Sequence, residues 1–402
     1  MKFDTIIIGG GLSGLTAGLR LQKAGQNTAI VSAGQNALHF SSGTFGVLND
    51  GAVLPEGHPY TKVGDRLDAC LDAIPAFFAE AGITLQGDPR RNGWRLTPSG
   101  TLLQARFALE DCTLLDKPDY DFARKVLIVN IPGFLDFNTA FLADALSSRG
   151  LAVRIAHLDV EELTALRTSP SEMRSVQIAR VADRIPGKIA EAVRTLLDGE
   201  DTVILPQVFG LTDASVPAQV AGAVPARVLF VGTMPPSVPG IRAQMQLKRA
   251  YEQAGGTFLM GDEAVAPVMD EGHVKALRTL NLGAHLLQAD HYILATGSFF
   301  SKGLASSMQK IYEPLFGLDV FHDPDRTRWY DLDFFAPQAY GRFGVETDRH
   351  FRALKDGKVI DNLYVAGSVL AHCDAQQLGC GGGVAIISAL TAADYILEGG
   401  KA

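Results

Sequence analysis

The chain has 402 residues, of which 47% are hydrophobic, and its formal net charge at pH 7 is −8. This length suits two domains with sizeable cores, and the negative charge argues against nucleic acid or an anionic membrane surface as a direct partner. No stretch of about 18 uncharged apolar residues and no apolar N-terminal signal segment is found, so we expect a chain that is soluble when isolated and cytoplasmic.

The first predicted elements are a strand over residues 3–8 and a helix over residues 12–23, joined by a glycine-rich turn. The turn has the spacing Gly-x-Gly-x-x-Gly at Gly9, Gly11 and Gly14. In nucleotide-binding turns the first glycine makes the bend, the second lets a phosphate approach the backbone, and the third lets the helix pack on the strand. A glycine-rich turn without a ligand is the alternative, but the position between strand and helix favours nucleotide or flavin binding.

The second predicted strand, residues 28–31, is followed by Ser32. In the usual dinucleotide fingerprint an Asp or Glu at this place accepts a hydrogen bond from the adenosine ribose. No acidic residue occurs between Thr5 and Asn49. The site is therefore expected to bind a phosphate without a ribose carboxylate, which favours FMN. FAD is the alternative, with Ser32 and Gln35 together holding the ribose.

A small polar loop with Ser41, Ser42 and Gly43 comes next, where flavoproteins run the chain past the isoalloxazine ring. We expect cofactor contact here, with a surface turn as the alternative. The middle of the chain then alternates between strand and helix patterns, which predicts an inserted second α/β domain. Its predicted strands are 126–131, 151–158, 202–205 and 227–231, and its clearest helices are 139–146 and 189–197.

After prolines at 235–239, a helix over 241–251 and a strand over 257–260 are expected to rejoin the first sheet. Two more strands end in glycine turns, one at Gly297 and one at Gly367 and Ser368. Carboxyl ends of parallel strands lie at one sheet edge, so the three turns should converge. The predicted fold class is α/β: a discontinuous Rossmann-like flavin-binding domain with a parallel sheet (1–58, 236–300, 340–402) and an inserted substrate or capping domain (59–235, 301–339).

A last glycine cluster, with Gly381 and Gly382, precedes a predicted helix over 384–397. If the helix N-terminus faces the flavin pyrimidine, its free N–H groups and dipole stabilise the negative charge that reduction produces. The alternative is a helix end packed under a loop.

Three further side chains are candidates for the reaction itself. His372 lies between the last two glycine turns and is a candidate proton-transfer group, although a single histidine is more often structural. Arg326 and Arg328, beside Trp329, are candidates for holding a substrate phosphate, with an ordinary surface loop as the alternative. The four cysteines, Cys70, Cys112, Cys373 and Cys380, lack the C-x-x-C spacing of clusters and zinc sites, so no metal is expected.

Several segments together resemble one known family, the B subunit of anaerobic glycerol-3-phosphate dehydrogenase. They are FDTIIIGGGLSGLTAGLRLQKAG (3–25), ALHFSSG (37–43), PPSVPGIR (235–242), ATGSFFSKGL (295–304), DFFAPQ (333–338) and NLYVAGSVLAHCDAQQLGCGGGVAIISAL (362–390). The resemblance runs from end to end. More distantly, residues 343–368 are similar to fumarate reductase and succinate dehydrogenase flavoproteins. Where many flavoproteins carry an acidic residue after the last Ala-Gly, this chain has Ser368.

The resemblance implies an FMN-containing subunit of a three-part enzyme that oxidises sn-glycerol 3-phosphate to dihydroxyacetone phosphate. It implies electron transfer to menaquinone in fumarate or nitrate respiration. The implied partners are an FAD-containing A subunit and an iron–sulfur C subunit, the latter attaching the complex to the cytoplasmic face of the inner membrane. Two other interpretations stay open: an electron-transfer flavin subunit without an organic substrate, and a non-catalytic partner that stabilises the FAD-containing subunit.

Overall fold

The computed structural model describes residues 1–168 and 173–399 and divides into two compact units. Unit 1 comprises Met1–Ala37, Phe45–Gly82 and Gln246–Ala402, and unit 2 comprises Leu38–Thr44 and Ile83–Met245. This division differs from the predicted one because residues 59–82 and 301–339 belong to unit 1, whereas residues 38–44 and 236–245 belong to unit 2.

Packing explains the difference. Helix α3 (Leu67–Glu80) packs on helix α11 (Gly381–Gly399), and strand β18 (Val320–Phe321) pairs with β19 (Gly344–Val345). A buried cluster of Ile311, Trp329 and Phe343 also joins the 301–339 segment to the C-terminal part of unit 1.

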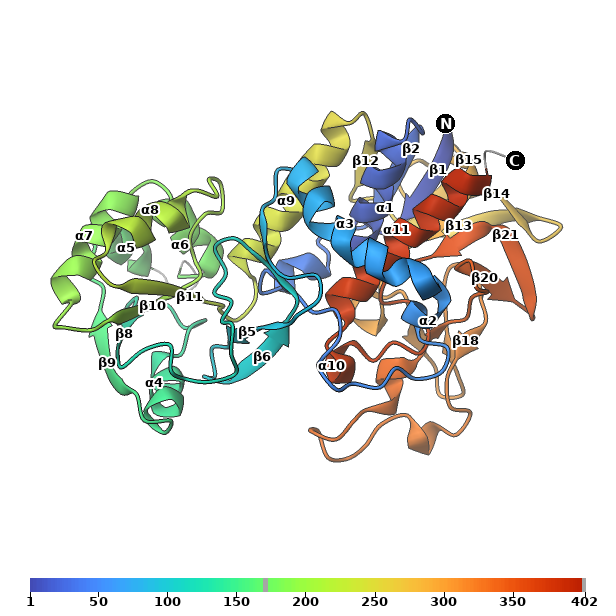
Figure 1. The fold of residues 1–402 in the computed structure, drawn as a ribbon. Coiled ribbons are helices and arrows are strands. Elements are labelled where there is room, and N and C mark those ends of the chain that lie inside the picture. Colours follow the sequence, from blue (N-terminus) through green and yellow to red (C-terminus); the bar gives the residue numbers. More distant parts are fainter. Residues whose placement is uncertain (169–172, 400–402) are drawn as a thin grey trace. The chain divides into compact units, whose positions relative to one another are not determined.

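The centre of unit 1 is a six-stranded sheet with the order β12-β2-β1-β15-β21-β20 (Figure 1). All neighbours are parallel except β20 and β21. The strands are β1 (Lys2–Ile8), β2 (Thr28–Ser32), β12 (Thr257–Met260), β15 (Gln288–Leu294), β20 (Arg352–Lys355) and β21 (Lys358–Val365). The run Ile6–Ile8 is buried, as expected for an inner parallel strand covered on both faces.

Helices α1 (Leu12–Lys23) and α11 lie side by side (Figure 1). Helix α9 (Val238–Gln253) begins three residues before its predicted start and crosses the division between the units. Residues Ala264–Asp270 and His273–Thr279 form an antiparallel hairpin, β13–β14, that sequence analysis did not predict. Further short elements of unit 1 include α2 (Pro59–Val63), α10 (Ala375–Leu378), β16 (Ala305–Ser306) and β17 (Ile311–Tyr312).

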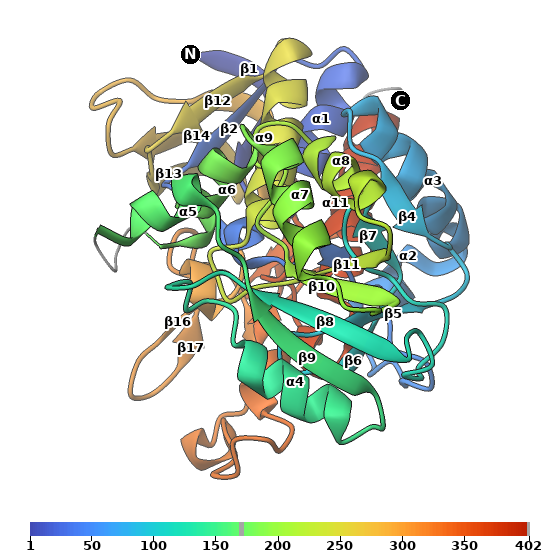
Figure 2. The same ribbon diagram turned by 90° about the vertical axis from the view of Figure 1, so that its left-hand side faces the viewer.

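Unit 2 contains a second, fully parallel sheet with the order β11-β10-β8-β9 (Figure 2). Its strands are β8 (Lys125–Asn130), β9 (Ala152–His157), β10 (Thr202–Pro206) and β11 (Arg227–Val231). Its helices are α4 (Thr139–Ser147), α5 (Glu161–Thr164), α6 (Ser175–Ala182), α7 (Pro186–Leu196) and α8 (Val216–Ala223). Short strands β4 (Leu85–Gly87), β5 (Gly93–Leu96), β6 (Leu102–Ala105) and β7 (Phe107–Leu109) form antiparallel pairs.

The predicted fold class is therefore confirmed: a discontinuous parallel sheet and a second α/β domain are both present. In the described part of the chain, no helix combines the length and apolar character that crossing a membrane requires.

Candidate functional site

The strands of unit 1 end level with one another. Ile8 is in register with both Val31 and Leu294, and Leu294 is in register with Val365. The residues that follow these strands therefore meet at one edge of the sheet, as the sequence predicted. This edge contains the three predicted glycine turns.

The first turn is packed tightly at two of its glycines. Gly9 has φ +118°, and a Cβ atom there would lie 2.2 Å from the carbonyl oxygen of Ala295, after β15. A Cβ at Gly14 would lie 1.8 Å from the carbonyl oxygen of Gly9. Only glycine permits helix α1 and the two strand ends to approach so closely.

Gly11 is different because the space over it is open. Among the described residues, apart from its neighbours along the chain, the only heavy atom within 4 Å of a Cβ built there is Cβ of Asn36, at 3.9 Å. Gly11 also lies immediately before α1, where N–H groups without partners inside the helix attract anions. Three properties thus fit a phosphate: an open approach, exposed backbone and a helix N-terminus.

The other predicted turns lie beside the first. A Cβ at Gly367 would be 2.2 Å from Ser13 Oγ, in the first turn of α1, and a Cβ at Gly297 would be 3.6 Å from Ser368 Oγ. The Gly367 N–H donates to Ser388 Oγ at 2.9 Å, which fixes this turn to α11. The structure therefore brings Gly297, Gly367 and Ser368 together with the opening glycines.

Ser32 ends β2 and is 5% exposed. Its hydroxyl donates to the carbonyl oxygen of Gly34 at 3.3 Å, and a Cβ at Gly10 would lie 2.6 Å from it. The side chain thus packs against the turn, with a neutral hydroxyl where a dinucleotide site usually has a carboxylate.

Helix α11 begins at Gly381, three residues before its predicted start. The first turn of α11 consists of glycines, and the surroundings leave little room for side chains there. A Cβ at Gly382 would lie 3.0 Å from Cα of Phe45, and one at Gly383 would lie 2.2 Å from Tyr60 Oη. The Gly383 N–H donates to the carbonyl oxygen of Gly46 at 2.8 Å, so part of the helix end is already paired with the loop.

The structure groups Ser41, Ser42 and Gly43 with unit 2. There the carbonyl oxygen of Gly43 accepts from the Leu109 N–H at 2.8 Å, and Cys112 Sγ would lie 2.6 Å from a Cβ at Gly43. Contact of these three residues with a cofactor stays a prediction.

His372 is held by a carboxylate in unit 1. Its Nε2 lies 3.1 Å from Oε1 of Glu346, and its ring centroid lies 4.2 Å from that of Phe321. Because Nε2–H faces the carboxylate, Nδ1 carries the lone pair in the neutral ring, and this buried atom has no hydrogen-bond partner among the described residues. His372 also has φ +64°, a left-handed backbone that is uncommon outside glycine and frequent at functional sites.

The charges around His372 keep Glu346 ionised. The hydrogen bond from His372 lowers the pKa of Glu346 against the opposing effect of burial, and the charge of Lys62 adds to the lowering. Lys62 Nζ donates to the carbonyl oxygen and hydroxyl of Thr347 at 2.9 and 2.8 Å, and burial lowers its own pKa. His372 and Glu346 therefore form a hydrogen-bonded pair, and the Lys62 ammonium, held by Thr347, acts on the Glu346 carboxylate through its charge.

Arg326 and Arg328 do not lie in this group. Both are exposed in a short 3₁₀ helix, Arg326–Arg328. The Arg326 guanidinium lies 5.7 Å from the Trp329 ring centroid, and that of Arg328 lies 3.6 Å from Asp325. These local contacts suit the surface-loop alternative.

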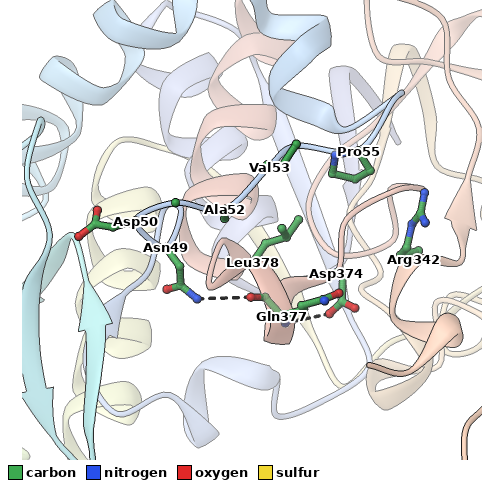
Figure 3. Close-up of a pocket in the computed structure, with 10 residues that line it drawn as sticks. Asn49, Asp50, Ala52, Val53, Pro55, Arg342, Asp374, Gln377 and Leu378 are labelled. Atoms are coloured by element: carbon green, nitrogen blue, oxygen red, sulfur yellow. Dashed lines mark hydrogen bonds between the residues drawn. The ribbon is translucent and has the colours of Figure 1, made fainter. Parts of the chain in front are cut away.

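A pocket of about 490 Å³ lies near the N-terminal end of α11 (Figure 3). Its polar lining includes Arg342, Asp374 and Gln377, which sequence analysis missed. Asp374 Oδ1 accepts from the Gln377 N–H at 3.0 Å, and Figure 3 shows Asp50 at the end of the pocket away from Arg342. The carbonyl oxygen of Arg342 accepts from the His372 N–H at 2.8 Å, so the pocket adjoins the His372–Glu346 pair.

Comparison with known proteins identifies the family. A sequence profile described as "FAD binding domain" matches residues 4–384. The B subunit of anaerobic glycerol-3-phosphate dehydrogenase from Pectobacterium atrosepticum is 38% identical, with both chains covered completely. The chain belongs to the family of anaerobic glycerol-3-phosphate dehydrogenase B subunits. The B subunit from Vibrio cholerae is 35% identical over 99% of this chain and 97% of its own.

Membership of the B subunit family confirms the predicted resemblance and an oxidoreductase subunit with a flavin-binding fold. The profile describes FAD binding and gives no support to FMN. Among solved structures, the 3-ketosteroid delta1-dehydrogenase of Sterolibacterium denitrificans is 12% identical, with a TM-score of 0.44, over 99% of this chain and all of its own.

Proposed function

We propose that this chain is the flavin-dependent subunit of a quinone-linked anaerobic dehydrogenase that oxidises sn-glycerol 3-phosphate to dihydroxyacetone phosphate. The observation that carries the proposal is the edge of the unit 1 sheet, where an open Gly11 is surrounded by tightly packed glycine turns. The substrate is inferred from the names of the relatives.

Residues of this edge fit a flavin. The turn with Gly9, Gly11 and Gly14 would hold its phosphate, and Gly297, Gly367 and Ser368 would line its path along the sheet edge. Gly381 and Gly382 would present the α11 N-terminus to the electron-rich end of the ring. The bound flavin would supply the acceptor for the two electrons that leave the substrate carbon.

The residue assigned to proton transfer is His372. Oxidation of a secondary alcohol removes a proton from oxygen and a hydrogen with two electrons from carbon. Nδ1 of His372 is the proposed acceptor of the hydroxyl proton because its lone pair is unpaired while Glu346 holds Nε2–H. The Glu346 carboxylate would also stabilise the imidazolium formed by that transfer.

Arg342 is proposed to bind the substrate phosphate, in place of Arg326 and Arg328. It lines the pocket, forms no ion pair with a carboxylate among the described residues, and is joined through its backbone to His372. Phe321 lies beneath both groups: its ring centroid is 6.0 Å from the Arg342 guanidinium carbon and 4.2 Å from the His372 ring. The proposed phosphate ligand, Arg342, and the proposed base, His372, therefore both pack against Phe321.

The identity of the flavin depends on Ser32. A charge-assisted bond from ribose to a carboxylate contributes about 1.5–3 kcal/mol, and a serine hydroxyl offers only a neutral bond. Loss of the ribose contact with retention of the phosphate contact favours FMN, whereas the family profile describes FAD. The expected outcome is FMN: protein denatured after purification should release it on chromatography, and stoichiometric FAD alone would refute the assignment.

The proposed complex contains an FAD-bearing A subunit and an iron–sulfur C subunit. The iron–sulfur partner would attach this chain peripherally to the cytoplasmic face of the inner membrane and pass electrons to menaquinone. The designation of the relatives as a B subunit supports an assembly of several chains.

The decisive experiment uses the purified chain without partners. We expect a bound flavin spectrum that bleaches anaerobically on addition of sn-glycerol 3-phosphate. A bound flavin that bleaches only when the FAD-bearing partner is added would instead support an electron-transfer subunit. A colourless chain that stabilises the FAD-bearing partner would support a non-catalytic role and refute the proposal.

A further inference from the structure

Three buried side chains that the proposed reaction does not use lie together in unit 1. They are His58, Cys373 and Cys380, and their ligating atoms all lie within 4.8 Å of one another. Cys380 Sγ lies 3.6 Å from Cys373 Sγ and 3.7 Å from His58 Nε2. The spacing C-x₆-C gave no sign of this in the sequence.

The proton on His58 argues against a metal ion here. Nδ1 of His58 accepts a hydrogen bond from the Tyr60 N–H at 3.1 Å, at the start of helix α2. The neutral ring must then carry its hydrogen on Nε2, the nitrogen that faces Cys380. A metal-ligating histidine has the opposite arrangement, with its free nitrogen donating to a carboxylate or carbonyl.

The same proton stabilises a thiolate at Cys380. His58 Nε2–H points at Cys380 Sγ, and Cys380 also caps α11, since its carbonyl oxygen accepts from the Val384 N–H at 2.8 Å. A helix N-terminus and a nearby donor both favour the anionic sulfur. The carbonyl oxygen of Asp374, which would accept from a thiol, is farther away at 3.9 Å.

The pKa values of the two thiols shift in opposite directions. Hydrogen bonding from Cys373, assisted by His58, lowers the pKa of Cys380, while the same contact and burial raise the pKa of Cys373. The His58 donor and the helix N-terminus thus favour the anion on Cys380, and the proton is favoured on Cys373. This is the arrangement of a reactive cysteine next to a resolving cysteine.

We propose that Cys373 and Cys380 form an oxidation site, a redox-active dithiol whose oxidant is hydrogen peroxide. The Cys380 thiolate attacks one peroxide oxygen, the O–O bond breaks, and the released hydroxide takes up a proton to give water and a sulfenic acid. Cys373 then attacks the Cys380 sulfur, the S–O bond breaks, and the Cys373 proton leaves with the hydroxide as a second water. Two thiols are oxidised by two electrons, and one peroxide is reduced to two waters.

The surroundings favour this small, uncharged oxidant. Cys380 is fully buried and Cys373 is 7% exposed, which excludes bulky disulfides. Bond formation requires the sulfurs to close from 3.6 Å to about 2.05 Å. The resulting loop contains Asp374, Gln377 and Leu378, so oxidation would deform a wall of the pocket near α11.

The test is mass spectrometric and does not depend on bound flavin or turnover. Full-length protein is treated with hydrogen peroxide, alkylated and mapped. We expect a single Cys373–Cys380 disulfide that dithiothreitol reverses, whereas Cys373→Ser should stop at a dimedone-reactive sulfenic acid on Cys380. Cys112, whose pKa is raised by burial, is the internal control and should stay reduced.

Two variants of His58 isolate the role of its proton. His58→Leu and His58→Gln both lose the Nδ1 acceptor that caps α2, but only glutamine retains an N–H donor toward Cys380. Oxidation at pH 7 should slow about tenfold in the leucine variant and recover substantially in the glutamine variant. The proposal would be overturned if the leucine and glutamine variants were oxidised at equal rates. Preferential oxidation of Cys70 or Cys112 would also overturn it, as would stoichiometric zinc released by thiol alkylation.

Discussion

The two units build the same kind of parallel sheet but use its carboxyl edge differently. In unit 1 the edge is made of glycine turns, and the space over Gly11 is open. In unit 2 the strand β10 is followed by Gln207, which is 2% exposed and donates to Cys112 Sγ at 2.8 Å. Side chains thus fill the place that bare backbone leaves accessible in unit 1. The sheet provides a scaffold in both, and the strand exits decide whether a ligand can approach.

The largest expected effect tests this contrast directly. Gly11→Val should purify folded but with little or no flavin, because the new side chain enters the open space over Gly11, where Asn36 Cβ, at 3.9 Å, is the nearest atom of the described residues beyond the chain neighbours. The absorbance ratio of flavin to protein measures the loss. Gly222→Ala, in helix α8 of unit 2, is the control, because a Cβ at Gly222 would meet no atom of another described segment within 4 Å. It should retain flavin and gain about 0.5–1 kcal/mol of stability. Full occupancy in Gly11→Val would place the phosphate elsewhere.

His372→Gln should lower kcat for sn-glycerol 3-phosphate by about 10²–10⁴-fold, the usual contribution of a general base. Flavin content should be unchanged, since no glycine turn is altered. Steady-state kinetics with the assembled enzyme measures the effect. A loss below about threefold would mean that the His372–Glu346 pair is structural.

Asp111→Asn should affect unit 2 alone. Asp111 and Arg242 form a buried ion pair, with side chains 3% and 5% exposed. Removing one charge leaves the other unpaired and should cost about 3–5 kcal/mol in the free energy of unfolding. Urea denaturation measures this cost. The protein that remains folded should keep its flavin; a parallel loss of flavin would break the contrast between the units.

Arg342→Ala should raise KM for sn-glycerol 3-phosphate about tenfold or more, because a charge-assisted bond to phosphate is lost. The matched control is Arg326→Ala, which removes an equally charged, exposed side chain outside the pocket. Its KM should stay within about twofold of the unaltered enzyme. The reverse result would favour Arg326 and Arg328 as the phosphate ligands.

The smallest effect concerns pH and unit 2. The hydrogen bond from Arg154 lowers the pKa of Glu200 from about 4.5 to about 2. This folded-state pKa lies below the unfolded one, so the contribution is complete above about pH 4.5 and is lost as pH falls through the folded-state pKa of about 2. Glu200→Gln should therefore lose about 1 kcal/mol at pH 7, after allowance for solvent screening of the half-exposed arginine, and progressively less as pH falls through about 2. If the unfolding free energies of the variant and the unaltered protein differed by the same amount from pH 7 to pH 2, ionisation of Glu200 would not contribute to stability in this way.

Sequence reasoning succeeded where structure is local. The glycine spacing and apolar strands predicted β1, α1 and the convergence of three strand exits, because each signal lies within a few residues. Arg342 and Asp374 were missed because only the folded segment between β18 and α10 brings them together. The compact units differ from the predicted division at residues 59–82 for a related reason: the packing of α3 on α11 joins segments about 300 residues apart, which no local pattern records.

The discontinuity of unit 1 also has a consequence for biosynthesis. Strand β1 has its partner β15 some 280 residues later in the chain. At ribosomal rates of about 5–20 residues per second, the N-terminal strand waits on the order of 15–60 s for that partner. The four strands of the parallel sheet of unit 2 all lie within residues 125–231 and emerge during this interval. The nascent chain therefore exposes an apolar strand edge for most of its translation, and an unpaired edge of this kind is prone to aggregation until its partner strand covers it.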